Sequence, residues 1–137
     1  DIATLADLTP PEIVDGPFAQ IIRYEGKRKG TSLGSETYDF YKICLQDHAV
    51  LDVLKQRSDL TLLPFCLYII THELIHIVRF SKFLQNFNAS PDEKLAEERR
   101  VHEITHQILA SVRLANLPAV LEYYQQWRSP LEDLGAF

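Results

Sequence analysis

Cysteine is scarce in this sequence. The chain has two, Cys44 and Cys66, and they do not form the C-x-x-C pair that is typical of zinc-thiolate and dithiol redox sites. Both lie within apolar stretches, so we expect buried free thiols, with a disulfide or an accessory metal ligand as the alternative. Free thiols are typical of a reducing compartment, and we therefore expect a cytoplasmic protein.

Positive charge is also limited. The chain has 14 lysine and arginine residues against 19 acidic ones, which gives a net charge of −5, and its one dense basic run is the Lys-Arg-Lys at 27–29. This balance argues against a nucleic-acid partner. The longest apolar run, Leu60–Ile70, is interrupted by Pro64 and is shorter than the roughly twenty residues of a membrane-spanning helix. We therefore expect no membrane partner either.

The N-terminal quarter is broken by proline and glycine. A length of 137 residues suits a single domain with its own core. Within it, residues 1–34 contain turn-forming residues too often for regular structure, apart from a short extended piece at 18–24. We therefore predict an irregular N-terminal arm over residues 1–34.

Helical spacing dominates the rest of the chain. Apolar residues predict a helix over 35–57, with Ser35 as its N-cap, and a central helix over 61–85 that is apolar nearly all round. Ser90, Pro91 and an acid at the third helical position predict the start of a third helix that runs to about Ala115. The sequence thus predicts an all-α fold, an antiparallel helical bundle of three long helices and a shorter fourth (118–128), spanning residues 35–128, followed by a tail over 129–137.

Two H-E-x-x-H motifs are the main functional signal, His72-Glu73-x-x-His76 and His102-Glu103-x-x-His106. Positions i and i+4 of a helix lie on one face, so two imidazoles at this spacing can bind one metal ion. Each copy also contains Glu-x-x-His at i and i+3, the unit with which helical bundles hold two metals.

A short loop near residue 88 would make the second and third helices an antiparallel hairpin, which brings the two motifs to similar heights. Asp47 and His48 of the first predicted helix fall at the same level, and Glu98 lies on the His102 face one turn earlier. Buried polar groups need partners, so we expect a metal site here; the alternative is a polar core network or a charged surface.

The repeated Glu-x-x-His resembles the ferritin-like di-iron carboxylate bundles. Glu73, His76, Glu103 and His106 match the family's two Glu-x-x-His units. The chain departs from the pattern because its first predicted helix offers Asp47 or His48 where the family has a Glu. The resemblance implies two metal ions per chain, iron favoured and zinc or manganese as alternatives, in a centre for oxygen or redox chemistry on oxygen or a small molecule. His72, His102 and one of Asp47, His48 or Glu98 would complete or support the shell.

The first motif also looks like that of the gluzincin zinc metallopeptidases. In that family a Glu on a following helix is the third ligand, a place that Glu97 or Glu98 would fill. This resemblance implies one zinc ion on His72, His76 and Glu98, with Glu73 as the catalytic general base. It leaves the second motif without a role.

A third interpretation is a non-catalytic metal site for storage, sensing or structure. A shell closed by protein ligands indicates structure or storage, whereas an open position indicates chemistry. We therefore expect a non-haem di-iron oxidoreductase, with a zinc hydrolase or a metal-binding protein without activity as the alternatives. The aromatic fourth helix, with Tyr123, Tyr124 and Trp127, either packs into the core or contacts a second copy in a homodimer.

Overall fold

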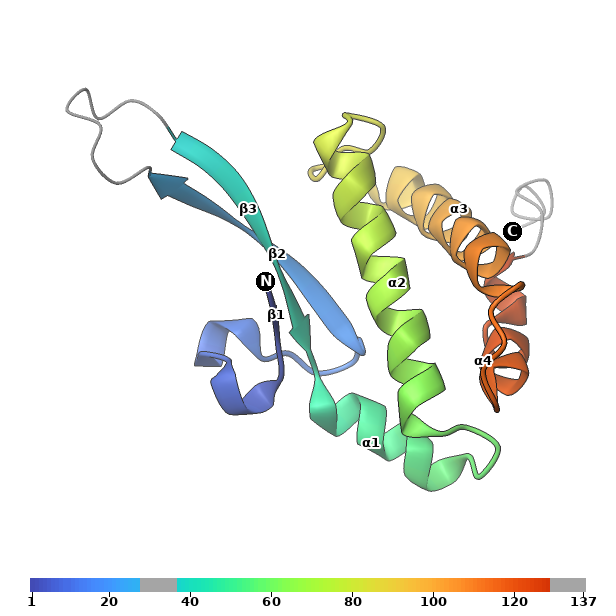
Figure 1. Ribbon diagram of the computed structural model, residues 1–137. Helices are drawn as coiled ribbons and strands as arrows, with labels where there is room; N and C mark the ends of the chain where they lie inside the picture. The colour runs from blue at the N-terminus through green and yellow to red at the C-terminus, as the bar shows by residue number, and fades with distance from the viewer. Residues whose placement is uncertain (28–36, 129–137) are drawn as a thin grey trace. The chain divides into compact units, whose positions relative to one another are not determined.

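The computed structural model describes residues 1–27 and 37–128, and the chain divides into two compact units, Asp1–Val53 and Leu54–Phe137 (Figure 1). The first unit holds strands β1 (Ile2–Ala3), β2 (Ala19–Lys27) and β3 (Thr37–Leu45), the 3-10 turns η1 (Leu5–Asp7) and η2 (Pro10–Glu12), and most of helix α1 (Asp47–Gln56). The second unit holds helices α2 (Leu62–Ser81), α3 (Pro91–Leu109) and α4 (Leu117–Tyr123), and the 3-10 turn η3 (Gln125–Arg128).

The first unit is built on a three-stranded sheet in the order β1-β3-β2. β2 and β3 pair antiparallel with Ile21 opposite Ile43, and β1 pairs parallel to β3 with Ile2 opposite Ile43. The C-terminal end of β3 is the most buried part of the sheet, with Ile43 and Cys44 at 1% and 0% exposure. The central strand therefore supplies much of the core of this unit.

This sheet shows that the predicted all-α bundle, with its irregular arm over 1–34 and its first helix over 35–57, is wrong. Apolar residues within 40–54 do recur at helical spacing, but residues 37–45 are rich in the β-branched and aromatic types that favour strands. The strand is stabilised by antiparallel pairing with the preceding strand β2, and the spacing of residues within 37–45 does not by itself reveal that pairing. The helix begins at Asp47 instead, and the predicted N-cap Ser35 lies outside the described residues.

A buried carboxylate ties turn η2 to the sheet. Glu12 is 2% exposed and accepts hydrogen bonds from the Thr9 backbone N–H at 2.8 Å and the Tyr24 hydroxyl at 2.7 Å. The Lys42 ammonium lies 2.9 Å from Glu12 Oε2, the oxygen that also accepts from Tyr24, and the Gln46 amide donates to the Glu12 backbone carbonyl at 3.0 Å. The Thr9 backbone bond, followed by Lys42 and Tyr24, lowers the pKa of Glu12 to about 2.

Acidification should unfold the first unit through Glu12. Its pKa of about 2 in the folded state lies below its ordinary value of 4.5, so its stabilising contribution is full above pH 4.5 and lost as the pH falls toward 2. Glu12→Gln should therefore lower stability at neutral pH and flatten this pH dependence. Hydrogen exchange of the β2 and β3 amides across this range measures the effect, with Glu25→Gln, at an exposed position of β2, as the control. Equal pH profiles for Glu12→Gln and the unchanged protein would contradict the assignment.

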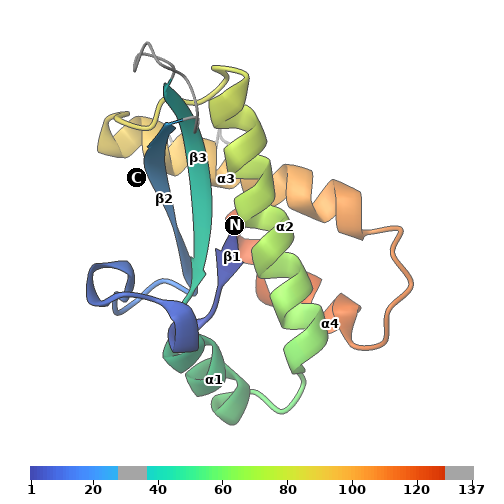
Figure 2. The same cartoon turned by 60° about the vertical axis from the view of Figure 1, so that its left-hand side comes forward.

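The second unit is helical, with α2 packed against α3 and α4 (Figures 1 and 2). As predicted, α3 begins after Ser90, whose hydroxyl accepts from the Glu93 backbone N–H at 3.3 Å. It ends at Leu109, earlier than predicted, and Asn116 then adopts a left-handed backbone with φ of 68° just before α4. The buried apolar core of this unit consists of Leu60, Phe65, Tyr68, Ile69, Val101, Leu109, Leu117, Val120 and Tyr124.

By length and composition alone, α2 could cross a membrane; it is the one helix of the described residues that meets these criteria. A third of its most apolar window is buried in the structure, and the central helix of a folded domain meets the same criteria. The buried face of α2 carries the polar residues described next.

Candidate metal centre

Four polar side chains from α2 and α3 converge inside the second unit. His72 and His76 lie one turn apart on the buried face of α2, at 5% and 7% exposure. Glu98 and His102 lie one turn apart on α3, where His102 is 5% exposed and the Glu98 side chain is 37% exposed. The i, i+4 spacing on two packed helices thus directs both pairs to the same place.

The inner atoms of these side chains lie at the spacing of metal ligands. The Nε2 atom of His72 is 2.6 Å from Glu98 Oε1 and 3.2 Å from His76 Nε2, and His76 Nε2 is 3.1 Å from Glu98 Oε2. His102 Nε2 is 3.6 Å from Glu98 Oε1, and ligand atoms of His72, Glu98 and His102 all fall within 4.8 Å of one another. A tetrahedral metal with bonds of about 2.0–2.2 Å separates its ligand atoms by about 3.3–3.6 Å, close to three of these four distances, whereas the 2.6 Å between His72 and Glu98 is the length of a hydrogen bond. The group is therefore compatible with binding a metal ion.

The outer nitrogens of two of these histidines have partners of their own. His76 Nδ1 is 3.0 Å from the Gln85 side-chain oxygen, and His102 Nδ1 is 2.7 Å from the Tyr68 hydroxyl. An amide oxygen only accepts, so it takes the Nδ1–H of His76 and leaves a lone pair on the Nε2 atom of the neutral ring. That lone pair faces the oxygens of Glu98, which are also acceptors. Two acceptors repel each other unless a proton or a metal ion lies between them.

The pKa values of these groups are consistent with a need for positive charge beside Glu98. Burial acts to raise the pKa of Glu98, but hydrogen bonds with His72 and His76 outweigh it and hold this pKa well below its ordinary range. Burial lowers the pKa of His72. It also acts to lower that of His76, where Glu98 outweighs it and raises the pKa. His76 is thus the histidine of this group that more readily carries positive charge beside Glu98.

Glu73 lies beside this group without belonging to it. It is half-buried on α2, and burial raises the pKa of its carboxyl to about 7, with His76 acting against the shift and Glu98 adding to it. A carboxyl that changes protonation near neutral pH suits general acid–base work.

The second motif is not brought into this group beyond His102. Glu103 is exposed and accepts a hydrogen bond from Gln107 at 3.4 Å. His106 is half-buried, and its Nδ1 atom is buried with no hydrogen-bond partner among the described residues. The structure therefore unites His102 with the first motif and leaves the predicted Glu103/His106 unit apart.

Two further candidates, Asp47 and His48, belong to the first unit. Asp47 accepts a hydrogen bond from the Leu5 backbone N–H at 3.2 Å, and His48 Nε2 lies 2.9 Å from the Val14 carbonyl oxygen. Both side chains thus hold the N-terminal turns of that unit.

Glu97, the alternative to Glu98 as a third ligand, is committed to arginines. Its carboxylate accepts from Arg79 of α2 and, at 2.6 Å, from Arg100. The outer partners Tyr68 and Gln85 were not found from the sequence. Tyr68 precedes His72 by one turn on the same helix face, which is a signal that could have placed it, whereas Gln85 lies in the loop after α2 and has no such signal.

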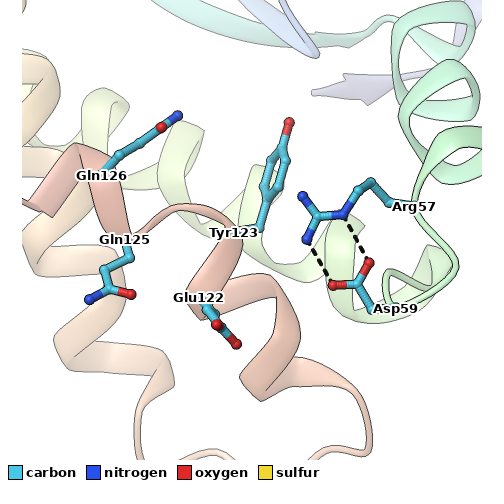
Figure 3. Close-up of a pocket in the computed structure, with 6 residues that line it drawn as sticks. All are labelled: Arg57, Asp59, Glu122, Tyr123, Gln125 and Gln126. Carbon is cyan, nitrogen blue, oxygen red and sulfur yellow. Dashed lines mark hydrogen bonds and ion pairs between the residues drawn. The ribbon is translucent and has the colours of Figure 1, made fainter.

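A separate cavity of about 590 Å³ lies at the start of α2 and the end of α4 (Figure 3). Arg57 pairs there with Asp59 at 2.8 Å, and its guanidinium lies over the Tyr123 ring at 5.3 Å. Glu122, Gln125 and Gln126 complete the lining, which contains none of the four converging residues.

No known protein family, curated protein or solved structure was found to match this chain.

Proposed function

We propose that the protein binds one metal ion through His72, His76 and Glu98 and uses it for hydrolysis, as the zinc metallopeptidases with the same motif do. One observation carries this proposal: the inner nitrogens of both H-E-x-x-H histidines and the Glu98 carboxylate lie 2.6 to 3.2 Å apart. Two nitrogens and one carboxylate oxygen form a ligand set typical of catalytic zinc. We therefore favour zinc over the two iron ions that the repeated Glu-x-x-His suggested.

Glu73 is the residue proposed to carry the proton chemistry. A zinc ion in such a site supplies a Lewis acid and makes a bound water more acidic. His72, His76 and Glu98 would hold and orient the ion, and Glu73, between the two histidines in sequence, would act as the general base that takes a proton from water. Burial raises the pKa of its carboxyl to about 7, which supports a role in proton transfer near neutral pH.

A closed, non-catalytic site is the second candidate, and His102 favours it. Its Nε2 atom lies 3.6 Å from Glu98 Oε1, close enough to complete a tetrahedral shell of protein ligands. His102→Ala separates the two candidates. A hydrolase with an open position keeps its metal and its activity in this variant, whereas a closed site loses affinity and has no activity to lose.

Elemental analysis of the purified protein tests the proposal. We expect one zinc ion per chain, loss of that metal in His76→Ala, and full metal content in His106→Ala, because His106 is not part of the group. Two iron or manganese ions per chain, with metal lost in His106→Ala, would instead support the di-metal centre. A protein that takes up no metal from a zinc-containing buffer would refute both.

A further inference from the structure

The loop between α2 and α3 reaches back to the proposed metal centre through one side chain. Gln85 lies nine residues after His76, and its side-chain oxygen is 3.0 Å from His76 Nδ1. His76 is 7% exposed and Gln85 is half-buried, so the Nδ1–H of His76 is largely shielded from water and would be costly to leave unpaired.

The backbone of this loop is strained in order to make the turn. Phe83 has a positive φ of 55° and is 94% exposed, so a bulky residue adopts the left-handed region without burying its ring. Such strain persists where the surroundings over-determine the conformation. Here Leu84 is anchored on both sides, since its N–H donates to the Arg79 carbonyl at 2.9 Å and its carbonyl accepts from the Arg79 guanidinium at 3.4 Å. The next residue is Gln85.

We infer that Gln85 is a positioning residue, which sets metal affinity by holding His76 with Nδ1 protonated and Nε2 turned to the metal. The inference rests on the proposed function. It follows from the chemistry of imidazole, because a neutral ring that donates from Nδ1 presents a lone pair at Nε2. Partners of this kind on the outer nitrogen of a metal-binding histidine are worth about 10- to 100-fold in metal affinity. The turn at Phe83 and the hydrogen bonds between Arg79 and Leu84 hold Gln85 where it contacts His76.

The orientation of the Gln85 amide determines which substitutions should keep zinc affinity and which should weaken it. With the oxygen toward His76, the ring is held in the metal-binding tautomer, whereas with the NH₂ group toward it the proton would move to Nε2 and block the ligand. A glutamate at this position can only accept when ionised. Gln85→Glu should therefore keep zinc affinity within a few-fold of the unchanged protein or increase it, whereas Gln85→Leu should weaken it.

The experiment is competition of the protein with a chromophoric chelator for zinc, together with the absorption spectrum of the Co²⁺-loaded protein. We expect Gln85→Leu to weaken zinc binding about 10- to 100-fold and to change the Co²⁺ spectrum, and Gln85→Glu to restore both. Gln107→Leu is the matched control, because Gln107 is exposed on α3 and bonds to Glu103 outside the group.

If Gln85→Leu does not fold, Gln85→Asn decides, since it keeps the amide but shortens its reach by one methylene. Equal zinc affinity in the unchanged protein and in the folded Gln85→Leu or Gln85→Asn variant overturns the inference and leaves the proposed function standing. Absence of zinc binding in the unchanged protein overturns the proposed function itself.

Discussion

Replacing Glu98 with glutamine should remove the protein's capacity to bind metal. The Glu98 carboxylate lies 2.6 Å from His72 and 3.1 Å from His76, and it is the one negative charge at the centre of the group. An amide of the same shape lacks that charge, and its NH₂ group would donate to the imidazole lone pairs that a metal ion needs. Since loss of an outer partner alone costs about 10- to 100-fold in affinity, loss of this inner group should cost more than about 100-fold.

Isothermal titration with zinc measures this directly, and Glu103→Gln provides the control on the same helix. Glu103 is exposed and bonds to Gln107, so its substitution should leave zinc affinity unchanged. The reverse result, with metal lost in Glu103→Gln and kept in Glu98→Gln, would exclude the proposed ligand set. It would instead support a di-metal centre on the two Glu-x-x-His units.

Much of the helical unit was predictable because its signals are local. Ser90 and Pro91 mark the start of α3 by their own capping and backbone chemistry. The sheet was missed because a strand is defined by its partner. Residues 37–45 carry an apolar spacing that fits a helix, and the hydrogen bonds of β2, the partner strand, decide between the two.

The candidate site likewise has one part that local sequence signals predict and one part that they do not. The spacing of His72 and His76 is a property of one helix turn, so the sequence alone places them together. The choice of Glu98 over Glu97 is not local. It depends on Arg79 of α2 and Arg100, which take the Glu97 carboxylate and leave Glu98 facing the histidines.

The similarity of the two H-E-x-x-H motifs suggests that both contribute equally to the site, which the structure does not show. The exposed position of Glu103 and the buried position of His102 follow from which face of α3 packs on α2, so the second copy contributes one residue to the group and not three. A repeated pattern predicts equal helix faces, but packing decides which of its residues turn inward.

Glu73→Gln should separate metal binding from hydrolysis. Glu73 is outside the group of converging ligand atoms, so we expect this variant to retain one zinc ion per chain with affinity within a few-fold of the unchanged protein. Its hydrolytic rate should fall by about 10²- to 10⁴-fold, the contribution typical of a positioned general base, because glutamine cannot accept the proton of the attacking water. The measurement pairs elemental analysis with a kcat determination on a library of fluorogenic peptides and esters.

The closest control for Glu73→Gln is Glu122→Gln, on α4 in the same unit, where an exposed carboxylate lines the separate cavity. Its activity and metal content should both stay unchanged. If Glu73→Gln keeps full activity on a substrate that the unchanged protein hydrolyses, the proton is carried by another group and Glu73 is not the base. If the unchanged protein holds one zinc ion, hydrolyses none of the library and loses zinc affinity in His102→Ala, the closed four-ligand site is the better description, and His102 is its fourth ligand.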